Sequence, residues 1–222
     1  MLKIDTQLNL KVMEMRHSIP NQLTIFRILL TPVFVFFFLK GGTSNIRIAS
    51  IIYLIASITD WYDGYIARRL HMITRLGQFM DPLADKILVS AALAVFAHEN
   101  YLEWWAVILI ITRDFLITGL RLFALYIGKP IITSVIAKWK TFLQMFFIFA
   151  LLIYLNIPGV PEIRLDRVSN PYLIWTTLSM YLIVVLTIVS GVHYLIVNRS
   201  HAMELFKRTF YLLTKPFQSK GD

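Results

Sequence analysis

The sequence predicts an all-α polytopic membrane protein with six transmembrane helices and an N-terminal helix on the membrane surface. Of its 222 residues, 57% are hydrophobic and only 16% are charged, whereas charged residues make up about a quarter of an ordinary soluble domain. The mean hydropathy is +0.65, and the apolar residues form runs of about 20, the length of a helix that crosses a bilayer. One soluble core of this size could not bury so much apolar surface.

Six apolar segments have the length of a span, and no internal repeat or linker divides them. Before them, residues 1–18 are polar and lack the apolar core of a signal peptide. Apolar residues recur on one side of a helix in this stretch, which is expected to lie on the membrane surface or to be a loose basic tail. The expected organisation is an interfacial segment 1–18, a six-helix domain 19–198 and a basic tail 199–222. The predicted spans are residues 20–40, 46–68, 77–97, 103–126, 134–155 and 171–198.

Lys and Arg residues are distributed unequally between the two sides of these spans. Fourteen lie in the two tails, the second-to-third connection and the fourth-to-fifth connection with its flank, against four on the other side. Because cytoplasmic loops are enriched in Lys and Arg, both termini are expected to face the cytoplasm. The net charge of +9 does not indicate a nucleic-acid partner, because the basic residues form no single stripe. With no cysteine, disulfides and thiolate metal sites are excluded.

Charged residues inside the predicted spans need an explanation, because each costs about 2.5–3.5 kcal/mol at the centre of a membrane helix. Interhelical ion pairs could account for Arg113 with Asp114 and for Asp85 with Lys86. They cannot account for four aspartates within 26 residues, because too few cations lie nearby. Helical spacing puts two of these carboxylates on one face of the second span and two on one face of the third, roughly 7–8 Å inside the cytoplasmic ends.

Four carboxylates at one depth repel each other and would take up protons unless a cation neutralises them. Oxygen ligands without cysteine predict one or two Mg²⁺ or Mn²⁺ ions rather than Zn²⁺. Gly64 and Gly77 either let a ligand approach the backbone or allow close helix packing. Pro82 either kinks the third span or marks its first turn. The four predicted metal ligands are Asp60, Asp63, Asp81 and Asp85.

In chain order the pattern reads Asp60-x-x-Asp63-Gly64-x-x-Ala67-Arg68 and, after eight residues, Gly77-x-x-x-Asp81-x-x-x-Asp85. It resembles, without a departure, the signature of the CDP-alcohol phosphatidyltransferases. The resemblance extends over about residues 19–197, toward the branch of the family that uses glycerol 3-phosphate as acceptor. The first span supports this resemblance with residues 19–24, Arg27 and Pro32, the fourth with residues 112–114 and 119–121, and the start of the fifth with residues 138–141. One position departs from the pattern: Ala137 stands where that branch more often has glycine.

The resemblance implies a homodimer that transfers a phosphatidyl group from CDP-diacylglycerol to an alcohol and releases CMP, in a bacterial inner membrane with the active site facing the cytoplasm. It implies that the aspartates hold metal ions at the diphosphate, and that Asp85 is the general base. Membrane anchoring by positive charge is the alternative role for Arg68. The residues expected to bind CDP-diacylglycerol are Gly64, Ala67, Arg68 and Gly77.

Glycerol 3-phosphate carries nearly two negative charges, so its pocket needs fixed cations. Arg113 and Arg121 lie two turns apart on one face of the fourth span, and Lys138 and Lys140 begin the fifth, where they are alternatively orientation signals. The alternative acceptors are phosphatidylglycerol, inositol phosphate and serine. A cation-coupled transporter is a distant alternative, because the acidic residues gather toward one side of the membrane. Residues expected to support the site are Asn21, Thr24 and Arg27.

Overall fold

The computed structural model describes residues 22–69, 75–128, 135–157 and 172–199, and within these ranges every regular element is a helix. All six helices agree with the predicted segments to within three residues, so the all-α prediction is confirmed for this part of the chain. The predicted surface helix, and the tail from residue 200, lie outside the described residues. The helices are Gln22–Lys40, α2 (Thr43–Arg69), α3 (Arg75–His98), α4 (Trp104–Tyr126), α5 (Val135–Leu155) and α6 (Tyr172–Val197).

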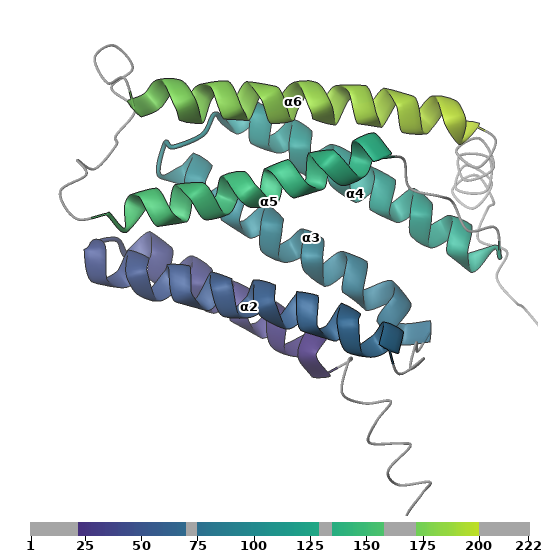
Figure 1. Ribbon diagram of the computed structural model, residues 1–222, viewed down its shortest axis with the longest axis horizontal. Coiled ribbons are helices and arrows are strands. Elements are labelled where there is room, and N and C mark those ends of the chain that lie inside the picture. The colour runs from purple at the N-terminus through teal and green to yellow at the C-terminus, as the bar shows by residue number, and fades with distance from the viewer. Residues whose placement is uncertain (1–21, 70–74, 129–134, 158–171, 200–222) are drawn as a thin grey trace, which may run out of the picture.

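The helices run side by side in alternating directions, so their ends gather at two opposite ends of the bundle (Figure 1). Helix pairs in contact are α5 with α6, α3 with α4, α4 with α6, α2 with α5, and α3 with α5. The motif end, near the acidic residues, consists of Gln22, Arg69, Arg75, Tyr126, Val135 and Val197. The distal end consists of Lys40, Thr43, His98, Trp104, Leu155 and Tyr172.

Aromatic contacts fix the first helix against its neighbours. Phe34 contacts Tyr53 of α2 with ring centroids 5.4 Å apart, and Phe38 contacts Phe96 of α3 at the same separation. All four rings are buried. The turn before α2 uses Gly41 at a φ of +69°, a left-handed conformation that glycine adopts without strain. The first helix is therefore held between α2 and α3.

Three helices are long and apolar enough to cross a membrane by length and composition: Gln22–Lys40, Val135–Leu155 and Trp175–Val197. The other three, α2 to α4, are as long but carry charged residues in their interiors. Large apolar side chains are nevertheless exposed on all six helices, including Leu29, Ile58, Ile87, Leu116, Phe146 and Leu178. Such a surface suits lipid rather than water, and the protein is an integral membrane protein.

Candidate active site

The acidic motif is divided between α2, with Asp60 and Asp63, and α3, with Asp81 and Asp85. The side chains of Asp81 and Asp85 are half-buried, and one helical turn separates them, so they share one face of α3. The side chains of Asp60 and Asp63 lie outside the described residues. Among the side chains that the structure describes, no three acidic or histidine residues come together. The metal site with four carboxylates therefore stays a prediction.

The first helix supports the acidic face of α3 directly. The Thr24 hydroxyl donates a hydrogen bond of 2.5 Å to Asp81 Oδ1, and the Thr24 side chain is buried. Arg27 lies three residues later, on the same face of that helix, and is only 1% exposed. Two of the three supporting residues expected from the sequence therefore face the bundle interior, while Asn21 lies outside the described residues.

Pro82 lies inside α3, seven residues after the helix begins at Arg75. It does not mark the first turn of the helix, so that alternative is wrong. Because proline has no N–H, the carbonyl of Gln78 cannot receive its usual helical hydrogen bond from residue 82. The carbonyl oxygen of Gln78, within one turn of Asp81, therefore lacks its usual helical donor.

Asp114 of α4 is the centre of a buried charge cluster. Its side chain is 2% exposed, and its Oδ1 accepts hydrogen bonds from Lys140 Nζ at 2.5 Å and from Arg113 Nη1 at 3.0 Å. Lys86 of α3 lies between two carboxylates, with its Nζ 3.7 Å from Asp114 Oδ2 and 3.8 Å from Asp85 Oδ2. Asp114 thus has three cations around it, and one of them, Lys86, also contacts Asp85. The cluster therefore places positive charge beside the acidic motif.

Helix α6 completes the surroundings of Arg113. Arg113 Nη2 donates to Ser190 Oγ at 2.9 Å. Gly191 follows, and a Cβ at that position would lie 3.4 Å from Arg113 Cγ, so the glycine leaves space for the arginine stem. Ser190 and Gly191 are adjacent small residues in a largely apolar helix, but nothing in the sequence alone pairs them with Arg113.

Several buried polar atoms around this cluster have no hydrogen-bond partner within the described residues. They are both amide atoms of Gln144, the hydroxyls of Thr187 and Tyr194, and Arg113 Nε. Gln144 lies one turn after Lys140 on α5, and Tyr194 lies one turn after Ser190 on α6. Because a buried polar group without a partner is costly, a hydrogen bond from water or a polar ligand would stabilise these atoms.

The predicted acceptor residues separate into two pairs. Arg113 and Lys140 converge on Asp114, and Lys140 is fully buried. Arg121 and Lys138 are exposed. Lys138 and Lys140 lie about 200° apart around α5 because successive residues rotate by about 100°. The ion pairs Arg113–Asp114 and Lys86–Asp85, considered above as the alternative to a site, are both present.

Of the residues expected to bind CDP-diacylglycerol, the structure describes only the surroundings of Gly77, which is buried at the start of α3. The surroundings of Gly64, Ala67 and Arg68 on α2 lie outside the described part of the structure. Lys86, Asp114, Ser190 and Gln144 were not expected as site residues. They are found only once the packing of α3, α4, α5 and α6 is known.

A helical bundle in the membrane that carries half-buried carboxylates beside a buried cation cluster has the features of an enzyme acting on a phosphate-containing lipid. Residues 17–192 match the family model described as CDP-alcohol phosphatidyltransferase. The chain belongs to this family and is a transferase.

Relatives named CDP-diacylglycerol–glycerol-3-phosphate 3-phosphatidyltransferase are similar over most of their length. The protein of Bacillus subtilis (strain 168) is 38% identical over 189 residues, which cover 80% of this chain and 93% of the relative. That of Rickettsia prowazekii (strain Madrid E) is 34% identical over 182 residues, covering 82% and 96%. That of Escherichia coli (strain K12) is 40% identical over 136 residues, covering 59% and 74%.

Proposed function

We propose that this protein transfers the phosphatidyl group of CDP-diacylglycerol to glycerol 3-phosphate, forming phosphatidylglycerophosphate and releasing CMP. The observation that carries this proposal is the similarity to relatives of that printed name, which this chain matches over 93% and 96% of their length. The buried cation cluster around Asp114 supports a doubly charged acceptor. An uncharged or zwitterionic acceptor such as serine would not neutralise the positive charge that this cluster holds in excess of Asp114.

All six helices are proposed to span the membrane, with both termini and the motif end on the cytoplasmic side of a bacterial inner membrane. The excess of Lys and Arg in the connections and tails on that side supports this orientation. The protein is proposed to act as a homodimer.

Asp60, Asp63, Asp81 and Asp85 are proposed to hold two Mg²⁺ or Mn²⁺ ions. Asp81 and Asp85 fit such ions, because both offer half-buried carboxylate oxygens on one face of α3 and hard cations prefer oxygen ligands. When bound, the ions would neutralise the diphosphate and polarise its phosphorus. Gly64, Ala67, Arg68 and Gly77 are proposed to contact the nucleotide side of the donor.

Asp85 is proposed to accept the proton of the acceptor hydroxyl. That oxygen attacks the phosphorus that bears diacylglycerol, the bond from this phosphorus to the CMP oxygen breaks, and CMP leaves with the electron pair. Lys86 Nζ, 3.8 Å from Asp85 Oδ2, holds positive charge beside this carboxylate. The reaction needs little covalent participation by the protein, so alignment and charge compensation dominate the rate.

Asp85→Asn is expected to lower kcat about 10²-fold, because a positioned general base contributes roughly 10²–10⁴-fold. The measurement is CMP release by purified protein in detergent at saturating substrates. Thermal unfolding of the variant serves as the control for folding. A kcat near that of the unsubstituted protein, with unchanged unfolding, would exclude Asp85 as the base.

The phosphate of the acceptor is proposed to bind at Arg113 and Lys140, with Arg121 and Lys138 near the entrance. Arg113→Gln is expected to raise the KM for glycerol 3-phosphate at least about tenfold, the effect of losing one charge-assisted contact of about 1.5 kcal/mol. The KM for CDP-diacylglycerol should change less than about twofold. Lys40→Gln, which removes an exposed cation at the distal end, is the matched control.

Arg113→Lys separates the shape of the guanidinium from its charge. Lysine keeps the charge but cannot donate to both Asp114 and Ser190 in the fixed geometry of the guanidinium, so an intermediate KM is expected. Equal increases in KM for both substrates in Arg113→Gln would remove the assignment of this pocket to the acceptor.

The experiment that tests the function is an acceptor panel. Purified protein and labelled CDP-diacylglycerol are incubated with Mg²⁺ or Mn²⁺ and, in parallel, with glycerol 3-phosphate, phosphatidylglycerol, inositol phosphate or serine. Labelled phosphatidylglycerophosphate and equimolar CMP are expected only with glycerol 3-phosphate. Preferential product formation with another acceptor would overturn the acceptor assignment, and no CMP release with any acceptor would overturn the proposed transfer.

A further inference from the structure

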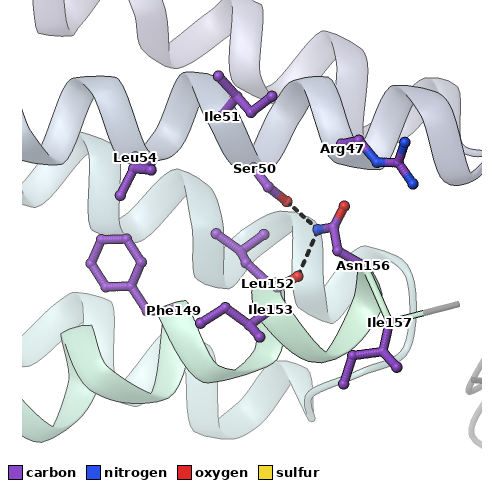
Figure 2. A pocket seen from close by; sticks show the side chains of 9 residues that line it. All are labelled: Arg47, Ser50, Ile51, Leu54, Phe149, Leu152, Ile153, Asn156 and Ile157. Atoms are coloured by element: carbon purple, nitrogen blue, oxygen red, sulfur yellow. Dashed lines mark hydrogen bonds between the residues drawn. The ribbon is translucent and has the colours of Figure 1, made fainter.

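A groove between α2 and α5 lies in the half of the bundle nearer the distal end, and Figure 2 shows the side chains that line it. Its volume is about 520 Å³, within the roughly 300–1,000 Å³ of ligand pockets. Arg47, at one end of the groove, lies one turn into α2, and Asp60 follows 13 residues later. At a rise of about 1.5 Å per residue, these two positions are about 20 Å apart along the helix axis. The groove is thus separate from the proposed transfer site.

The end of the groove near Arg47 is polar. The Asn156 amide nitrogen donates to Ser50 Oγ at 2.8 Å and to the Leu152 carbonyl at 2.7 Å. Asn156 Oδ1 is buried and accepts no hydrogen bond within the described residues. Arg47 is exposed, and the ion pairs found in the described ranges do not include it. This end therefore offers a cation and a buried hydrogen-bond acceptor.

The remaining wall is apolar. Figure 2 shows Leu54 and Phe149 at the end away from Arg47, with Leu152 and Ile153 between. Ile153 is 66% exposed and Leu54 45% exposed, so the groove is open at its side to the surrounding lipid. From Arg47 to Leu54 it extends about 10 Å along α2, which is less than half of a hydrocarbon core of about 30 Å. The polar and apolar parts therefore belong to one leaflet.

We propose that this groove binds an anionic phospholipid of the leaflet at the distal end. Its phosphate pairs with Arg47, a headgroup hydroxyl donates to Asn156 Oδ1, and an acyl chain lies against Leu54, Phe149 and Ile153. Charge complementarity favours this occupant: an Arg near the surface attracts anionic lipid, and a phosphate diester accepts from guanidinium. A soluble anion would leave the apolar wall uncovered.

The test is native mass spectrometry of the purified protein, released from detergent after titration with phosphatidylglycerol or phosphatidylcholine. Arg47→Gln is expected to weaken phosphatidylglycerol binding about fivefold to tenfold, the effect of one lost guanidinium–phosphate contact. Phosphatidylcholine also has a phosphate diester, but it carries no net charge and no headgroup hydroxyl for Asn156 Oδ1, so its binding should be weaker and should change less. Lys40→Gln removes another exposed cation at the distal end, outside the groove, and should leave both affinities unchanged. Equal phosphatidylglycerol binding by Arg47→Gln and the unsubstituted protein would overturn the proposal.

Further arms distinguish other occupants. In EDTA, the effect of Arg47→Gln should persist, because binding at Arg47 needs no divalent cation; its disappearance would assign the lipid to the acidic motif instead. Millimolar inorganic phosphate should not compete; competition would indicate a site for a free anion. Ile153→Trp should fill the groove and reduce lipid binding without changing the oligomeric mass. A change in that mass without a change in lipid binding would identify the groove as a subunit interface. None of these readouts depends on transferase activity.

Discussion

Asp81→Asn is expected to reduce CMP release about 10³-fold or more, the largest effect of any single substitution proposed for this protein. The amide keeps the shape of the side chain but loses the negative charge that a divalent cation requires. Metal-derived stabilisation of the transition state is worth several kcal/mol, and each 1.36 kcal/mol corresponds to about a factor of ten in rate. The measurement is single-turnover CMP release over a range of Mn²⁺ concentrations.

Thr24→Val provides the matched comparison. It removes the hydrogen bond to Asp81 Oδ1 while the charge of Asp81 remains, so a loss of about tenfold or less is expected from one hydrogen bond of about 1 kcal/mol. Mn²⁺ binding, followed by electron paramagnetic resonance, should be lost in Asp81→Asn and retained in Thr24→Val. If Asp81→Asn binds Mn²⁺ like the unsubstituted protein and releases CMP at a similar rate, Asp81 is not a metal ligand.

The helices could be predicted closely because long apolar runs, bounded by polar and charged residues, leave few alternatives for a chain in a bilayer. The prediction for α3, residues 77–97, differs from Arg75–His98 by two residues or fewer. The acidic motif was likewise visible, because charged residues inside apolar segments are rare. These inferences depend only on composition and helical periodicity, both of which the sequence contains.

The charge cluster around Asp114 could not be predicted in the same way. Its partners Lys86 and Lys140 come from α3 and α5, and which faces of two helices meet depends on how each rotates about its axis. The sequence suggested only the adjacent pairs Arg113–Asp114 and Asp85–Lys86, and it grouped Lys138 with Lys140. Helical periodicity places Lys138 and Lys140 on different faces of α5, but the rotation of α5 decides that Lys140 is buried and Lys138 exposed.

Asp114→Ala is expected to destabilise the protein by about 3–5 kcal/mol, because it leaves buried cations without their carboxylate. Lys140 is fully buried and loses its 2.5 Å contact, and Arg113 loses its 3.0 Å contact. The measurement is the apparent Tm in detergent at a fixed scan rate, because membrane proteins often unfold irreversibly. Glu99→Gln is the control: it removes the negative charge from the exposed 3.0 Å contact between Glu99 and His98, and should cost no more than about 1 kcal/mol.

A double variant distinguishes a structural from a functional role for Lys140. Asp114→Leu combined with Lys140→Met replaces the buried pair with apolar side chains, and such replacements are often neutral or stabilising. The apparent Tm should therefore recover a large part of the loss seen in Asp114→Ala. The KM of the double variant for glycerol 3-phosphate should be higher than that of the unsubstituted protein, because one cation of the proposed acceptor pocket is missing. A double variant with normal Tm and normal KM would mean that Lys140 serves only to neutralise Asp114. The acceptor phosphate would then have to bind without a contact to Lys140.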